Sequence, residues 1–128
     1  MYQILVLDYY ECCFAQVYSD AEIKIIYNEK SLVPKKHKAG GQSAPRFSRI
    51  RQNEIKKWFK DINEFLKTQH GEIYIGISSV YYSTFLKNLN TYNKQKIKEQ
   101  FCCEYADDTG IYDMINRIEI FNKSLKNS

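Results

Sequence analysis

The stretch "YQILVLDYYECCFAQVY", residues 2–18, decides the fold class. It contains two compact apolar runs of strand length, 2–8 and 12–18, separated by a short polar group that suits a tight turn. A second turn at Ser19-Asp20 leads to residues 22–30, where polar and apolar side chains alternate enough for a third strand. Three short strands joined by two tight connections predict an antiparallel meander.

The remainder of the chain predicts alternating helices and strands. After Ser43, apolar residues recur every three or four positions, which is typical of an amphipathic helix. Ser43 suits its N-cap, and Pro45 suits its first turn. The expected elements are a helix over 44–69, a strand over 72–78, helices over 80–89 and 92–100, a strand over 101–105 and a helix over 111–125.

The order β-β-β, loop, α-β-α-β-α predicts an α/β (α+β) fold. We expect a mixed five-stranded sheet, in which three N-terminal antiparallel strands are followed by two strands with helical crossovers. We expect the helices to pack on the sheet and the loop after the third strand, which is rich in Lys and Arg, to protrude. The chain of 128 residues has the size of one domain, which we place at 1–126 with a frayed tail at 127–128.

Composition excludes several classes of protein. A hydrophobic content of 44% with 15% aromatic residues excludes a mostly disordered chain. No apolar run is long enough to span a bilayer, so no membrane association is expected. The four cysteines form two neighbouring pairs, Cys12-Cys13 and Cys102-Cys103, which match neither a zinc knuckle nor a redox motif. We expect reduced thiols in a cytoplasmic protein, with one thiol of each pair packed inside.

Positive charge is concentrated in one segment. Residues 30–53 contain seven Lys or Arg and no carboxylate, whereas the rest of the chain has twelve basic and fifteen acidic groups. The net charge of +4 therefore comes from a single region. A local positive field of this kind attracts polyanions.

The centre of that region is "PKKHKAGGQSAPRFSRIR", residues 34–51. It resembles the catalytic middle domain of the class I translation termination factors of eukaryotes and archaea, whose signature it matches at thirteen of these eighteen positions. The departures include Lys38 and Ala39, where the family has Gly and Arg, and Pro45, where it has Leu. Weaker similarity extends over nearly the whole chain. The decoding domain and the GTPase-binding domain of the full factors have no counterpart in this sequence.

The resemblance implies hydrolysis of the peptidyl-tRNA ester in the ribosomal peptidyl-transferase centre, in termination or in rescue of stalled ribosomes. The implied catalytic residues are Gly40, Gly41 and Gln42. The glycines give a slender tip with unusual backbone torsions, and the Gln42 amide positions a water molecule. The residues expected to contact RNA are Lys35, Lys36, His37, Lys38, Ser43, Arg46, Arg49 and Arg51.

The implied partners are the ribosome, through its large-subunit rRNA, and peptidyl-tRNA. A glutamine methyltransferase would be a further partner if Gln42 is methylated, and a decoding protein acting in trans would supply codon recognition. No metal and no organic cofactor are implied. Two alternatives stay open, namely a peptidyl-tRNA nuclease of ribosome quality control and a non-catalytic ribosome- or RNA-binding module with the same fold.

Four other residues have simpler structural interpretations. Trp58, with its aromatic neighbours, is expected in the core rather than on a base-stacking platform. His70 precedes Gly71 and is expected to cap the end of the long helix. Asp107 and Asp108 resemble a metal pair, but before Thr-Gly they are better explained as turn and helix-cap residues.

Overall fold

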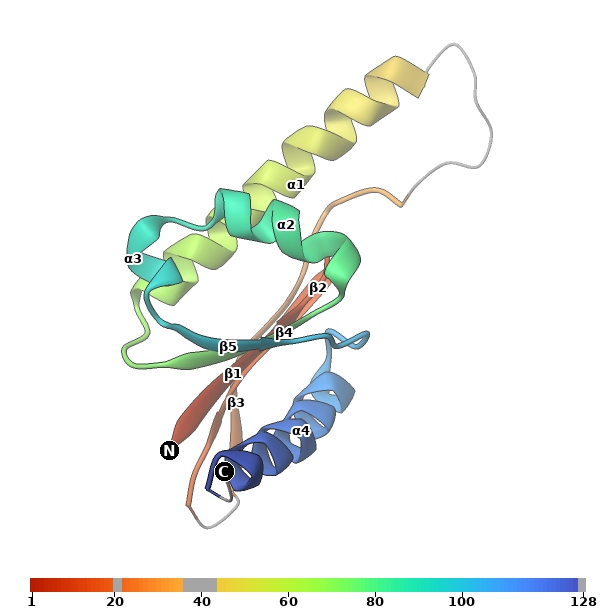
Figure 1. Ribbon diagram of the computed structural model, residues 1–128. Coiled ribbons are helices and arrows are strands. Elements are labelled where there is room, and N and C mark those ends of the chain that lie inside the picture. Colours follow the sequence, from red (N-terminus) through yellow and green to blue (C-terminus); the bar gives the residue numbers. More distant parts are fainter. Residues whose placement is uncertain (20–21, 36–43, 127–128) are drawn as a thin grey trace.

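A five-stranded sheet forms the centre of the protein in the computed structural model, which describes residues 1–19, 22–35 and 44–126 (Figure 1). The strand order across the sheet is β3-β2-β1-β4-β5. The strands are β1 (Tyr2–Leu7), β2 (Glu11–Val17), β3 (Ile23–Lys30), β4 (Ile73–Ile77) and β5 (Ile97–Phe101). The second predicted turn includes Asp20, which lies outside the described residues.

The sheet is mixed, as predicted. β1 pairs antiparallel with β2, and β2 pairs antiparallel with β3. β1 and β4 are parallel, as are β4 and β5. Helical segments connect β3 to β4 and β4 to β5, as crossovers between parallel strands require. The N-terminal meander and the two helical crossovers are both confirmed.

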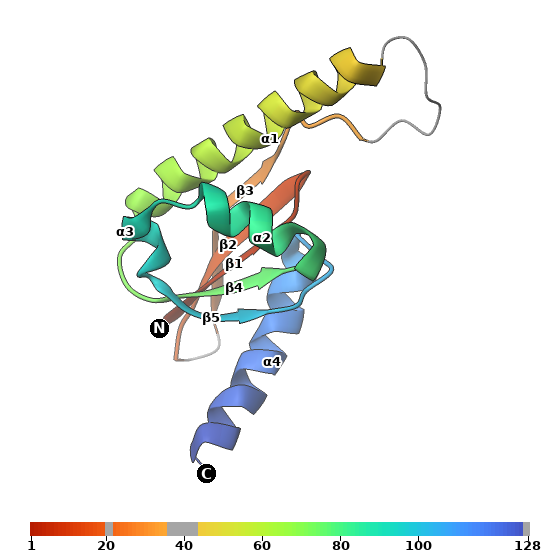
Figure 2. The same cartoon turned by 45° about the horizontal axis from the view of Figure 1, so that its top comes forward.

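Helices cover both faces of this sheet. They are α1 (Ala44–Lys67), α2 (Ser79–Asn88), α3 (Thr91–Lys94) and α4 (Asp108–Lys126). Figures 1 and 2 show α1, α2 and α3 on one side of the sheet and α4 on the other. None of the helices in the described ranges has the length and apolar character needed to cross a membrane.

β1 contributes to the two cores in alternation, because successive side chains of a strand point to opposite faces. Leu5 and Leu7 join the core beneath α1 and α2, whereas Ile4 and Val6 join the core beneath α4. The first core receives Ile55, Trp58, Phe59, Ile62 and Leu66 from α1, and the second receives Ile111, Met114 and Ile118 from α4. Trp58 is 5% exposed, which confirms its assignment to the core.

The region before the last helix differs from the prediction. Only Thr91–Lys94 is helical in the segment expected to be helical over 92–100, and the fifth strand covers Ile97–Phe101 rather than 101–105. β5 is an edge strand with mostly half-buried side chains, so its sequence lacks the apolar run of a central strand. Its Lys, Gln and Glu residues favour helix by intrinsic propensity, but backbone pairing with β4 decides the structure.

The cysteines are all free thiols, but their burial differs from the expected alternation. Cys12 and Cys13 are both buried, because helices cover both faces of β2. Burial raises the pKa of Cys12 to about 12 and that of Cys13 to about 11. In the second pair Cys103 is buried and Cys102 is exposed, as predicted, although both follow β5 instead of lying in a strand.

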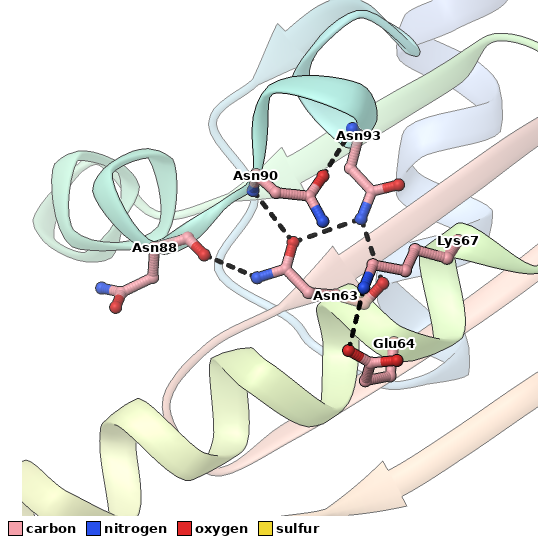
Figure 3. A network of polar contacts seen from close by, with 6 residues as sticks. All are labelled: Asn63, Glu64, Lys67, Asn88, Asn90 and Asn93. Carbon is pink, nitrogen blue, oxygen red and sulfur yellow. Dashed lines mark hydrogen bonds and ion pairs between the residues drawn. The ribbon is translucent and has the colours of Figure 1, made fainter.

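A group of asparagines joins α1 to the connection between α2 and α3 (Figure 3). The Asn63 amide donates to the carbonyl of Asn88 at 2.5 Å, and its oxygen accepts from the backbone N–H of Asn90 at 3.2 Å. Asn93, which is 1% exposed, donates to the backbone and side-chain oxygens of Asn63 at 3.0 and 3.2 Å. These bonds fix the C-terminal half of α1 on the body of the protein.

Candidate functional site

The predicted catalytic residues lie outside the part of the chain that the structure describes. Gly40, Gly41 and Gln42 fall within 36–43, together with Lys36, His37, Lys38 and Ser43 and the predicted protruding loop. The structure does describe both flanks of this segment. One flank is residues 31–35, which follow β3, and the other is the first turns of α1.

The first flank is held by the turn between β1 and β2. The backbone N–H of Ser31 donates to the carbonyl of Tyr10 at 2.8 Å, and the Ser31 hydroxyl donates to the carbonyl of Tyr9 at 2.6 Å. The backbone N–H of Val33 donates back to that hydroxyl oxygen at 3.2 Å, and the Val33 side chain is buried in the core beneath α1. Residues 31–33 therefore have a fixed path.

That turn is itself anchored to α1. The Asp8 carboxylate accepts hydrogen bonds from the backbone N–H groups of Tyr10 and Glu11 at 2.7 and 2.9 Å, which closes an Asx turn. The Asp8 carbonyl accepts from the Trp58 indole N–H at 2.9 Å. The short polar segment between the first two strands, which the sequence predicts only as a turn, thus links the sheet to α1.

The second flank extends away from the sheet. Figures 1 and 2 show the N-terminal part of α1 projecting past the strands, while its C-terminal half lies over them. Arg46 and Arg49 are exposed on this projecting part, and Lys35 is exposed on the first flank. Among the described residues, the ion pairs are Glu64–Lys67, Glu72–Lys98 and Asp113–Arg117, so these three cations belong to none of them.

Arg51 differs from the other predicted RNA-contacting cations. Its side chain is 8% exposed, and its guanidinium group points at the first flank. Nε donates to the Pro34 carbonyl at 3.2 Å, and Nη2 donates to the Tyr10 hydroxyl at 3.0 Å. The guanidinium carbon lies 5.5 Å from the centre of the Tyr9 ring, within cation–π range.

The geometry offers a cationic surface at the two ends of the segment 36–43. Exposed Lys35, Arg46 and Arg49 surround the two ends of 36–43, and no carboxylate occurs between 30 and 53. In the ranges that the structure describes, no three His, Cys, Asp or Glu side chains converge on a possible metal position. This arrangement suits electrostatic binding of a polyanion such as RNA.

Two predicted capping roles have different outcomes. The Asp107 carboxylate accepts from the backbone N–H groups of Thr109 and Gly110 at 3.1 and 3.4 Å, which confirms the turn and cap assignment. At the end of α1, the cation that bonds the backbone carbonyls is Lys96 and not His70. Its Nζ donates to the carbonyls of Leu66 and Gln69 at 2.5 and 2.6 Å.

Sequence reasoning missed the residues that organise the flanks, namely Tyr9, Tyr10 and Ser31. The only local signal was the Asp at the start of the β1–β2 turn, a residue type that forms Asx turns. The contact between Tyr10 and Arg51 spans 41 positions of sequence, so no spacing rule identifies it.

Comparison with known proteins places these observations in a family. The model of the family described as eRF1 domain 2 matches residues 1–127. Among curated proteins, a peptide chain release factor subunit 1 from Picrophilus torridus is 28% identical over 135 aligned residues, covering 98% of this chain and 33% of the relative. Proteins of the same name from Archaeoglobus fulgidus and Thermoplasma acidophilum are 28% and 26% identical, covering 91% and 98% of this chain and 31% and 32% of the relatives.

The chain thus spans about a third of the length of these relatives, between 31% and 33% of each. A solved structure described as an archaeal protein superposes with a TM-score of 0.47 at 13% identity, covering 98% of this chain and 40% of the other. The family match does not depend on that superposition, because it comes from the sequence.

Proposed function

Because the chain belongs to the eRF1 domain 2 family, we propose that it promotes hydrolysis of the peptidyl-tRNA ester in the peptidyl-transferase centre of the ribosome. The observation that carries the proposal is the family match over residues 1–127, which contain Gly40, Gly41 and Gln42 between two cationic flanks. The activity serves termination or the rescue of stalled ribosomes.

In the proposed mechanism, the cations provide the affinity and the Gly-Gly-Gln tip provides the geometry. Lys35, Arg46 and Arg49 contact phosphates of ribosomal RNA and peptidyl-tRNA, which are the partners. Gly40 and Gly41 let the backbone pass where side chains would collide with RNA. The protein and its partners meet in the cytoplasm, where translation takes place.

Gln42 is proposed to position the attacking water. Its amide does not titrate near neutral pH, but it presents one acceptor and two donors in a short fork. Positioning alone lowers a barrier by roughly 7–11 kcal/mol in the best intramolecular cases. The Gln42 backbone N–H would donate to the developing oxyanion or the departing 3′-hydroxyl, and removing one donor of this kind typically costs about 2.7–4 kcal/mol.

A peptide-release assay tests this proposal. Ribosomes carrying labelled peptidyl-tRNA are mixed with the chain, with and without a stop codon in the decoding site. We expect release by the wild type and a loss of roughly 100-fold or more for Gly40→Ala and for Gln42→Ala. Gln95→Ala is the matched control, since Gln95 is an exposed glutamine at the C-cap of α3. Figure 1 shows α3 far from the N-terminal end of α1, so this variant should keep wild-type activity.

The products separate the alternatives. Free peptide with an intact tRNA 3′ end supports ester hydrolysis, whereas a shortened tRNA indicates a nuclease. Salt-sensitive ribosome binding without turnover indicates a non-catalytic binding module. Equal release by wild type, Gly40→Ala and Gln42→Ala contradicts the proposed mechanism. Dependence of release on an added factor tests for a decoding protein in trans, and mass spectrometry of Gln42 tests for a methyltransferase partner.

A further inference from the structure

We propose that Arg51 is a positioning residue that fixes the two flanks of the Gly-Gly-Gln segment relative to each other, rather than an RNA contact. This inference rests on the proposed function. It assigns Arg51 a different role from its neighbours Arg46 and Arg49, although all three belong to the same basic stretch.

The position of Arg51 on α1 explains its inward direction. It precedes Ile55, Trp58 and Ile62 at spacings of four, three and four residues, so it lies on the buried face of the helix. Arg49 lies two positions earlier and is exposed. The helical period therefore separates one arginine from the surface that the others share.

The acceptors of Arg51 belong to the opposite flank and to the turn that supports it. Nε bonds the carbonyl of Pro34 at 3.2 Å, two residues before the segment 36–43 begins. Nη2 bonds the Tyr10 hydroxyl at 3.0 Å, and the backbone carbonyl of Tyr10 in turn accepts from the Ser31 N–H at 2.8 Å. One side chain thus connects the chain entering the segment with the helix leaving it.

The supporting turn is rigidly packed. The Tyr9 ring faces the Arg51 guanidinium and also contacts the rings of Phe59 and Tyr81, with ring centres 5.8 and 4.4 Å away. Phe59 is 1% exposed in the core beneath α1. A side chain held by a carbonyl, a hydroxyl and an aromatic face has a fixed position, so it determines where Pro34 lies relative to α1.

The planar fork of arginine is required for this role. Two nitrogen donors pointing in different directions reach the Pro34 carbonyl and the Tyr10 hydroxyl together. A lysine ammonium keeps the charge but lacks the fork. If Arg51 acted as a phosphate contact, Lys would largely preserve its function, and if it acts by positioning, Lys would not.

If the wild-type chain releases peptide, release kinetics distinguish a positioning role of Arg51 from a phosphate contact. For Arg51→Gln and Tyr10→Phe we expect kcat to fall by roughly 10–100-fold, with little change in the half-saturating ribosome concentration and none in the salt dependence of binding. Arg51→Lys keeps the charge but should have a kcat little higher than that of Arg51→Gln. Arg49→Gln, two positions earlier on the exposed face, should instead weaken binding and reduce the salt slope by about one.

Tyr10→Phe protects the test against misfolding, because it removes one hydroxyl and keeps the ring. A reduced salt slope for Arg51→Gln, or full rescue by Arg51→Lys, would overturn the proposal. So would unchanged kcat in Arg51→Gln and Tyr10→Phe.

Hydrogen exchange of the isolated chain tests, without ribosomes, whether Arg51 clamps the two flanks together. The Ser31 amide donates to the Tyr10 carbonyl and the Val33 amide to the Ser31 hydroxyl, so Arg51→Gln should accelerate their exchange about tenfold or more, whereas Arg49→Gln should leave it unchanged. Unchanged exchange in Arg51→Gln would contradict the clamp. If the wild type exchanges as expected but releases no peptide, the proposed function fails while the clamp remains supported.

Discussion

Gly110 shows how strictly a single residue can be constrained. A Cβ atom on Gly110 would lie 2.1 Å from the carbonyl oxygen of Tyr105 and 3.3 Å from Val6 Cγ2. The obstacle at Tyr105 is backbone, so α4 or the loop before it would have to move. We predict that Gly110→Ala lowers the free energy of unfolding by roughly 3 kcal/mol, the upper end of typical overpacking costs. Urea unfolding followed by circular dichroism measures this loss.

Gly71→Ala is the control for this prediction. Gly71 has φ +95° but ample room, since its Cβ would meet only Gln3 Nε2 at 3.7 Å. We expect a loss of about 1–2 kcal/mol there, which comes from backbone conformation alone. Equal losses at the two glycines would contradict the steric explanation for Gly110.

At the scale of one element, Asn63 connects α1 with the loop between α2 and α3. Removing its side chain leaves the buried Asn93 amide without its Asn63 side-chain acceptor and the Asn88 carbonyl without its donor. We predict that Asn63→Ala lowers the free energy of unfolding by about 2 kcal/mol, because unsatisfied buried polar groups are costly. Thermal or urea unfolding checks the value.

The neighbouring Glu64 provides a matched control on the same turn of α1. Its carboxylate pairs with Lys67 at 3.1 Å, but both side chains are about half exposed, at 60% and 48% (Figure 3). We expect Glu64→Ala to change stability by less than about 0.5 kcal/mol, as is typical of surface ion pairs. Ala favours helix at both positions, so a loss comparable with that of Asn63→Ala would show that the effect is not specific to the asparagine network.

The sequence predicts elements well where one local pattern dominates. β1 and β2 are apolar runs, and α1 has a clear helical period, so their positions agree with the prediction to within a few residues. β5 could not be located in this way, because an edge strand takes its conformation from backbone pairing with β4. The Lys96 cap on α1 was missed for a similar reason, since its acceptor Leu66 lies 30 residues earlier.

The motif predicts which residues form the candidate site, but not how the two flanks are arranged. The family signature identified the cationic residues around 36–43, of which Lys35, Arg46 and Arg49 are exposed at the flanks. It could not separate Arg51 from them, because burial depends on which helix face meets Tyr9 and Tyr10. A stretch of basic residues in the sequence thus contains both exposed cations and a buried arginine that bonds other parts of the fold.

For the whole molecule, charge is divided between one basic region and an acidic remainder. Residues 30–53 carry seven basic groups and no acidic group, while the rest of the chain has three more acidic than basic groups. If ribosome binding is guided by this local field, the position of a charge matters more than the net charge. Two triple variants that each remove three positive charges separate these effects.

The first variant replaces Lys35, Arg46 and Arg49 by glutamine, and the second replaces the exposed lysines 87, 94 and 123. Ribosome affinity is measured as a function of KCl concentration for both. We predict that the first variant binds more weakly and that its salt slope decreases by about three, because each of the three cations neutralises one phosphate. The second should bind like the wild type, because its lysines lie on α2, α3 and α4, away from the flanks. Equal slopes in the two variants would mean that net charge, not the cationic flanks, governs binding.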